Sequence, residues 1–271
     1  MQSSKFVSYF GGISHALSAR DYRIYWYAHV FSSHGVWMHR MAVGGLIFQL
    51  TDSPAWLGFI GFVYSLPLML LGPIAGSIAD RFCIRLTAII AIVVTIVLTC
   101  LMAGFTLGRV MTPSLLAVFV IILGSVHAFD FPVRQVLILL LVGRDRMAAA
   151  IALNSTTFYT ASFTGPILAA AVLTVGNPYA GDATPGIVFV IYGLTMAALL
   201  FAILGTRMRD RGSEEGSSTD LVKDVLAGLR YTLSHDGTRL VLILSFCVCL
   251  LYTSDAADEG LGVDLGGRRI I

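Results

Sequence analysis

The sequence predicts an all-α, polytopic membrane protein. Of its 271 residues, 56% are hydrophobic and only 13% are charged, and the mean hydropathy is +0.82. No Asp, Glu, Lys or Arg occurs from residue 53 to 79, or again from 86 to 108. About 20 apolar residues suffice to span a bilayer, and lipid forces the backbone into helices or a closed barrel. Runs this long without alternation favour helices.

Charged and turn-forming residues delimit six spans in order. The turn at 52–54 separates the first from the second, and the charged stretch 80–85 separates the second from the third. Arg109 precedes the fourth, the charged triplet 144–146 precedes the fifth, and Arg207 follows the sixth. The expected spans are residues 22–50, 55–79, 86–107, 114–138, 148–175 and 186–205, and a seventh begins near residue 239.

The chain is expected to divide into four segments. Residues 1–205 form the six-helix transmembrane bundle, and residues 206–238 form a cytoplasmic linker with an amphipathic helix, because its apolar residues share one helical face. Residues 239–252 are too short for a complete seventh helix. The polar, glycine-rich stretch 253–271 is expected to be a non-native tail, and a genuine polar C-terminus is the alternative.

A short charged hairpin between the second and third spans contains Gly76, Asp80, Arg81 and Arg85. It resembles the loop Gly-x-x-x-Asp-Arg-x-x-Arg-Arg of the major facilitator superfamily, with Ile84 in place of one arginine. The resemblance implies a conformational latch, in which Asp80 pairs with the other half of the transporter. From the residues alone, a solvated turn that orients two helices remains the alternative.

Further segments follow at characteristic spacings. They are Trp37-Met38, residues 50–54, residues 129–135, residues 141–146, residues 150–155, Gly165-Pro166 and residues 228–231. Together they resemble the transmembrane secretion effector group of that superfamily, the bacterial exporter branch similar to the enterobactin exporter. The resemblance covers about residues 20–250.

This resemblance implies the N-terminal six-helix half of a twelve-helix fold, made of two three-helix repeats, with a partial seventh helix. It implies a secondary active transporter that exports a small organic molecule, siderophore or drug-like, by proton-coupled antiport and alternating access. The expected partners are that substrate, protons, the lipid bilayer and a missing C-terminal half of the same protein. The expected location is the bacterial inner membrane.

Two alternatives stay open, namely a non-transporting membrane sensor or scaffold, and a transporter for uptake or lipid flipping. A polar central cavity would favour transport, and a dry apolar helix interface would favour the scaffold. The sequence contains no Gly-x-x-x-x-Gly-Lys loop and no His-Glu-x-x-His motif. We therefore expect neither an enzyme nor a cofactor, and no nucleic-acid partner, because the basic residues follow the inner loops.

Three ionisable residues inside the spans are candidates for function. Asp130 and Arg134 are four residues apart and share a helical face, as a conformational switch pair or as a simple interface anchor. Arg40 lies about 15 Å below the outer end of its span by helical rise, near the middle of the membrane. An unpaired cation there is costly. We expect Arg40 to face a wet cavity or a partner acid and to handle substrate or protons.

Other polar residues in the spans are candidates for lining the substrate or proton pathway. For the histidines, an ordinary hydrogen-bonded helix position is the alternative, and their spacing does not suit a metal site. Gly165-Pro166 is expected to bend its helix and seal the cavity, or to form an ordinary proline kink. The further pathway candidates are His34, Trp37, His39, His127, Asn154 and Tyr159.

The distribution of basic residues predicts the topology. With the N-terminus in the cytoplasm, thirteen Lys and Arg residues lie in inside segments and only Arg109 lies outside, as the positive-inside rule requires. In a variant without the native cysteines, a single cysteine at Thr112 should react with an impermeant reagent added outside, and one at Ser213 should not. The reverse labelling pattern would contradict this topology.

Overall fold

The computed structural model describes residues 16–81, 83–175 and 184–206, with isolated positions between 230 and 244. For residues 73–81, 144 and 175 it describes the backbone alone. The chain divides into two compact units, residues 1–216 and 217–271. The expected linker helix, partial seventh span and C-terminal tail fall almost entirely outside the described residues and stay predictions.

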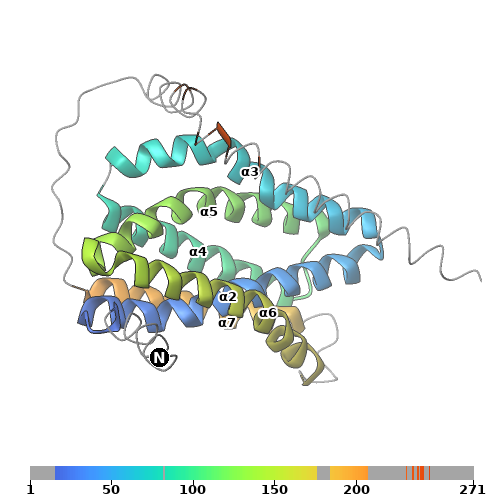
Figure 1. Cartoon of the computed structure of the whole chain (residues 1–271). Coiled ribbons are helices and arrows are strands. Elements are labelled where there is room, and N and C mark those ends of the chain that lie inside the picture. The colour runs from blue at the N-terminus through green and yellow to red at the C-terminus, as the bar shows by residue number, and fades with distance from the viewer. Residues whose placement is uncertain are drawn as a thin grey trace, which may run out of the picture. The chain divides into compact units, whose positions relative to one another are not determined.

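Six long helices make up the described part of the first unit (Figure 1). Each contains one of the expected spans, so the predicted helices are confirmed. No strand occurs in the described ranges. The helices are α2 (Arg20–Thr51), α3 (Pro54–Arg81), α4 (Ile84–Leu107), α5 (Pro113–Val142), α6 (Met147–Val175) and α7 (Thr184–Gly205), with a short 3-10 helix η1 (Arg144–Arg146) before α6.

Five of these helices, α3 to α7, are long and apolar enough to cross a membrane. Helix α2 is long enough but less hydrophobic than the other five, because it contains several serines, histidines and tyrosines. Local signals fix the tight connections. Asp52 ends α2 in the left-handed conformation (φ 47°), and the Thr112 side chain caps α5 by accepting from the Leu115 N–H. The chain is a multi-pass membrane protein.

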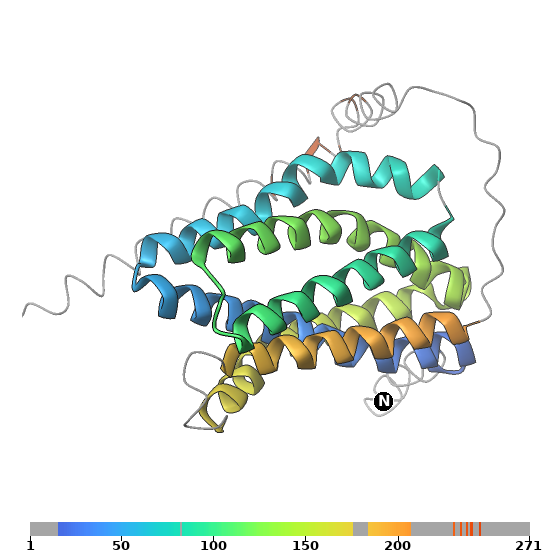
Figure 2. The same ribbon diagram turned by 180° about the vertical axis from the view of Figure 1, so that it is seen from behind.

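The helices pair in a pattern that fits two three-helix repeats. Helix α2 packs mainly on α6 and α7, α5 packs mainly on α3 and α4, and α4 packs on α7 (Figures 1 and 2). Exchanging α2 with α5, α3 with α6, and α4 with α7 leaves this set of main contacts unchanged. Consecutive helices α3 and α4 touch little, although only two residues join them.

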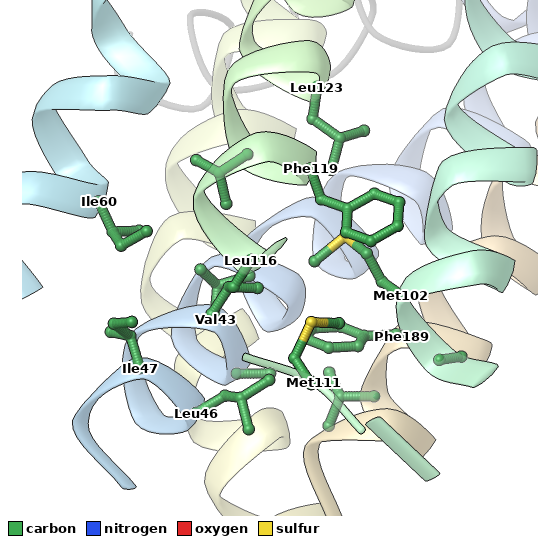
Figure 3. Packing of buried hydrophobic residues seen from close by; sticks show 14 of the residues in the cluster. Val43, Leu46, Ile47, Ile60, Met102, Met111, Leu116, Phe119, Leu123 and Phe189 are labelled. Carbon is green, nitrogen blue, oxygen red and sulfur yellow. The ribbon is translucent and has the colours of Figure 1, made fainter. Parts of the chain in front are cut away.

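Two apolar clusters occupy opposite ends of the bundle. One contains Tyr22, Leu137 and Leu199, from the start of α2 and the ends of α5 and α7. The other contains Leu46 and Leu116, from the end of α2 and the start of α5, and in Figure 3 the side chains of Met102, Phe119 and Phe189 converge in it. In α2 and α5, residues 29–40 and 124–134 lie largely between these clusters and carry every histidine of the two helices, together with Arg40, Asp130 and Arg134.

Glycines allow the closest helix contacts. A Cβ at Gly124 of α5 would collide with the backbone carbonyl of Tyr64 in α3, and one at Gly35 of α2 would collide with the Thr195 side chain of α7. Neighbouring backbones in membrane bundles approach this closely only where residues are small. The Gly124 contact thereby sets the spacing of α3 and α5 beside Tyr64.

Gly124→Ala should destabilise the bundle, because the added methyl group must push α3 away from α5. The expected loss is about 1–3 kcal/mol, as for overpacking in a core. Thermal unfolding of the purified protein in detergent, followed by circular dichroism, measures it. Gly104→Ala is the matched control, since nothing lies within 4 Å of a Cβ there. Equal unfolding temperatures for the two variants would contradict the close contact.

Candidate functional site

Two adjoining pockets lie among α2, α3, α5 and α6. The larger lies between the two apolar clusters, and the smaller borders the cluster that contains Leu46 and Leu116. The larger has a volume of about 400 Å³ and the smaller about 260 Å³. Arg40 and Tyr64 line both, so this pair stands at the boundary between them. The larger pocket is also lined by His29, Ser32, Ser33, Val36, Trp37, Leu68, Gly124, His127, Asp130, Phe131, Arg134 and Phe158.

Helical spacing explains why these residues face one space. Most lining positions recur at intervals of three or four residues, such as 29, 33, 36 and 40 in α2 and 124, 127, 131 and 134 in α5. Such spacing places side chains on one face of a helix. Two polar helix faces thus meet inside an otherwise apolar bundle.

Arg40 is held at the pocket by aromatic neighbours. Its Nη2 donates to the Tyr64 hydroxyl at 3.0 Å. Its guanidinium carbon lies 4.8 Å from the ring centroid of Trp37 and 4.7 Å from that of Tyr64, in cation–π geometry. Among the described residues Arg40 forms no ion pair. Arg40 therefore lines the pocket, and its role in handling substrate or protons stays a prediction.

His127 connects three helices through both of its ring nitrogens. The Tyr64 hydroxyl lies 2.9 Å from Nδ1, and the Tyr192 hydroxyl of α7 lies 3.3 Å from Nε2. The buried His39 ring packs on Tyr192 at a centroid distance of 4.9 Å. A continuous polar chain therefore runs from Arg40 through Tyr64 and His127 to Tyr192.

Asp130 and Arg134 form an ion pair within α5, one turn beyond His127. Their side chains are 8% and 15% exposed, so the pair is largely withdrawn from solvent. Arg134 also lies 3.9 Å from the Met196 sulfur of α7. Arg85 of the charged hairpin donates to the carbonyls of Ile203 and Leu204 at the end of α7.

The Gly165-Pro166 motif lies against α2 near the pocket. A Cβ at Gly165 would lie 2.5 Å from the Cβ of Trp37 and 3.4 Å from the carbonyl of His34. Glycine therefore lets α6 approach α2 closely, beside the tryptophan that flanks Arg40. Pro166 lies inside α6, which continues through it.

The other predicted site residues are not all brought to the pocket. Asn154 is half-buried and lines neither pocket, and His34 Nδ1 bonds the Val30 carbonyl of its own helix at 2.7 Å. Tyr159 is 71% exposed, with its ring against Phe158. Gly76, Asp80 and Arg81 belong to the last turns of α3, and their side chains fall outside the described residues.

Two tyrosines at the centre of the network, Tyr64 and Tyr192, were not predicted from the sequence. Tyr64 lies inside a charge-free run, and Tyr192 lies inside the sixth span, so neither stands out by composition. Depth was the available signal. Tyr64 follows Pro54 by ten residues, which places it about 15 Å into α3, the depth that singled out Arg40.

Comparison with known proteins gives two matches. A family model described as transmembrane secretion effector matches residues 14–257. The staphyloferrin A transporter of Staphylococcus aureus (strain NCTC 8325 / PS 47) is 24% identical over 145 residues, which cover 52% of this chain and 36% of that protein. The matched part of the chain thus spans about a third of that relative. No solved structure matches the chain significantly.

The hydrogen-bond directions predict one tautomer for His127. Arginine only donates, so the Tyr64 oxygen accepts from Arg40, and its own proton is directed to Nδ1. The imidazole proton should then reside on Nε2, facing Tyr192. The ¹⁵N shifts of the His127 ring nitrogens measure this directly.

Tyr64→Phe should remove the preference of the His127 proton for Nε2. It should also lower the free energy of unfolding by about 1–3 kcal/mol, because Arg40 and His127 Nδ1 lose the hydroxyl that they share. Tyr159→Phe is the control, since its side chain lies on the exposed surface. A protonated Nδ1 in the unchanged protein would show that the chain of hydrogen bonds runs otherwise.

Proposed function

This chain belongs to the transmembrane secretion effector family of the major facilitator superfamily, and on that premise we propose that the intact protein is a secondary active transporter that exports a small organic molecule. The observation that carries the proposal is the polar pocket at mid-bundle. Arg40, His127 and the Asp130–Arg134 pair gather there, between two apolar clusters. Ionisable groups inside a membrane are costly and usually serve transport or signalling pathways.

The composition of this pocket supports a transporter over a sensor or scaffold. A scaffold needs only a dry, close-packed helix interface, which the two apolar clusters would already provide. A transporter needs a space that receives a ligand, and pockets for small molecules typically measure about 300–1,000 Å³. The larger pocket, at about 400 Å³, lies within that range.

The proposed substrate is a siderophore or drug-like organic molecule. The relative named for staphyloferrin A supports a small organic solute in this family. We propose that the intact protein lies in a bacterial inner membrane with its N-terminus in the cytoplasm. A second six-helix half would complete the transporter and allow alternating access. The end of α3 at Asp80 and Arg81, with Arg85 at the start of α4, serves as the proposed latch between the halves.

The proposed coupling ion is the proton. The Asp130 carboxylate is the one acidic group that lines the described pocket, and it is linked to α7 through the contact of Arg134 with Met196. Uptake or release of a proton there would change whether Arg134 is paired. That change is an electrostatic switch at a helix contact, of the kind that biases a bundle between two conformations.

Asp130→Asn should reduce proton-driven export by about tenfold or more, because Arg134 loses its counter-charge inside the bundle. The measurement is substrate accumulation in inside-out vesicles under an imposed pH gradient, with the protein expressed from its complete locus. Asp145→Asn, which changes an exposed carboxylate of η1, is the matched control. Protein levels are compared by immunoblotting.

Unchanged export by the Asp130 variant at equal protein level would contradict the proposed coupling group. Absence of any gradient-driven transport by the unsubstituted protein, across siderophores and dyes, would contradict the proposed function itself.

A further inference from the structure

We infer that the larger pocket recognises an anion, namely a carboxylate carried on an aromatic or other flat apolar body, and that Arg40 is the group that binds the carboxylate. Only if the proposed function holds is this anion the transported substrate.

The larger pocket has an excess of positive charge in its described lining. Its described lining contains two guanidinium groups and one carboxylate. The Asp130 carboxylate is already paired with Arg134 in the same helix, which leaves the charge of Arg40 uncompensated. Protonation of the lining histidines His29 or His127 would add positive charge, so the sign does not depend on their state. A negatively charged ligand supplies the missing balance.

Arg40 has N–H donors left over for a ligand. A guanidinium has five N–H donors in one plane, and among the described residues one hydrogen bond goes to the Tyr64 hydroxyl. The rings of Trp37 and Tyr64 attract the positive charge but accept no hydrogen bond in that plane. Arg40 is exposed to the pocket, so its remaining donors are available for the two oxygens of a carboxylate.

The wall around Arg40 is largely aromatic. Trp37 and Phe158 meet edge to face at a centroid distance of 5.6 Å, and Phe131 lines the same pocket from α5. Val36 and Leu68 extend the apolar surface. Aromatic side chains favour flat apolar groups through stacked or edge-on contacts. A carboxylate at Arg40 therefore places the body of the ligand against these rings.

The test compares two probes that share one ring system, 2-naphthoate and its neutral amide 2-naphthamide. Binding to the purified 271-residue chain in nanodiscs is measured by titration calorimetry, with empty nanodiscs subtracted. We expect the carboxylate to bind about tenfold or more tightly than the amide, the ratio that one charge-assisted hydrogen-bonded pair typically gives. Equal affinities would overturn the inference without any variant.

Arg40→Gln should abolish the preference for naphthoate, and Arg40→Lys should retain part of it, because lysine keeps the charge but not the paired donors. Arg23→Gln is the matched control, since it removes an exposed guanidinium from the same helix and should keep the full preference. Circular dichroism and size exclusion establish that each variant is folded. A preference that survives Arg40→Gln would assign the anion to another group.

Binding and transport are read separately. Selective binding of naphthoate without transport by the intact protein contradicts the proposed function and leaves the anion site standing. Transport by the intact protein without any selectivity for the carboxylate contradicts the anion site alone.

Discussion

The positive charge of Arg40 inside the membrane bundle is the constraint on which the centre of this structure depends. A cation in that environment needs partners, because lipid supplies none. Tyr64 provides a hydroxyl, that hydroxyl engages His127, and His127 engages Tyr192. One charged side chain in α2 is thereby linked by hydrogen bonds to side chains of α3, α5 and α7.

The apolar clusters at the two ends make this polar layer effective. By excluding water from the ends of the bundle, they lower the local dielectric, which strengthens each hydrogen bond and raises the cost of leaving one unmade. The Asp130–Arg134 pair balances its own charge within α5 and does not draw on the Arg40 chain. The bundle therefore holds two electrostatic units side by side, one neutral as a whole and one that carries a net charge.

The sequence predicted those features that depend on one helix at a time. Charge-free runs located the six helices, depth placed Arg40 at mid-bundle, and the four-residue spacing paired Asp130 with Arg134. The sequence did not predict contacts between helices. Tyr64 and Tyr192 acquire their importance only because α3 and α7 approach His127, and Arg85 turned to the end of α7 because that helix lies beside α4. Such contacts depend on packing that no local spacing encodes.

The exchange pattern of the helices has a consequence for how such a bundle can be assembled. In each three-helix repeat, α2–α4 and α5–α7, a helix has a counterpart in the other repeat. The contact of α2 with α6 has a symmetric copy, that of α5 with α3, whereas α4 contacts its own counterpart α7 in a single contact. Contacts of these two kinds are the ones that a twofold axis generates between identical partners. A single three-helix peptide of this design, inserted into the membrane in both orientations, would carry all the surfaces needed to pair with itself. The covalent link between the two three-helix repeats then lets their sequences diverge, so that an arginine at the position of Arg40 is needed in the first repeat only.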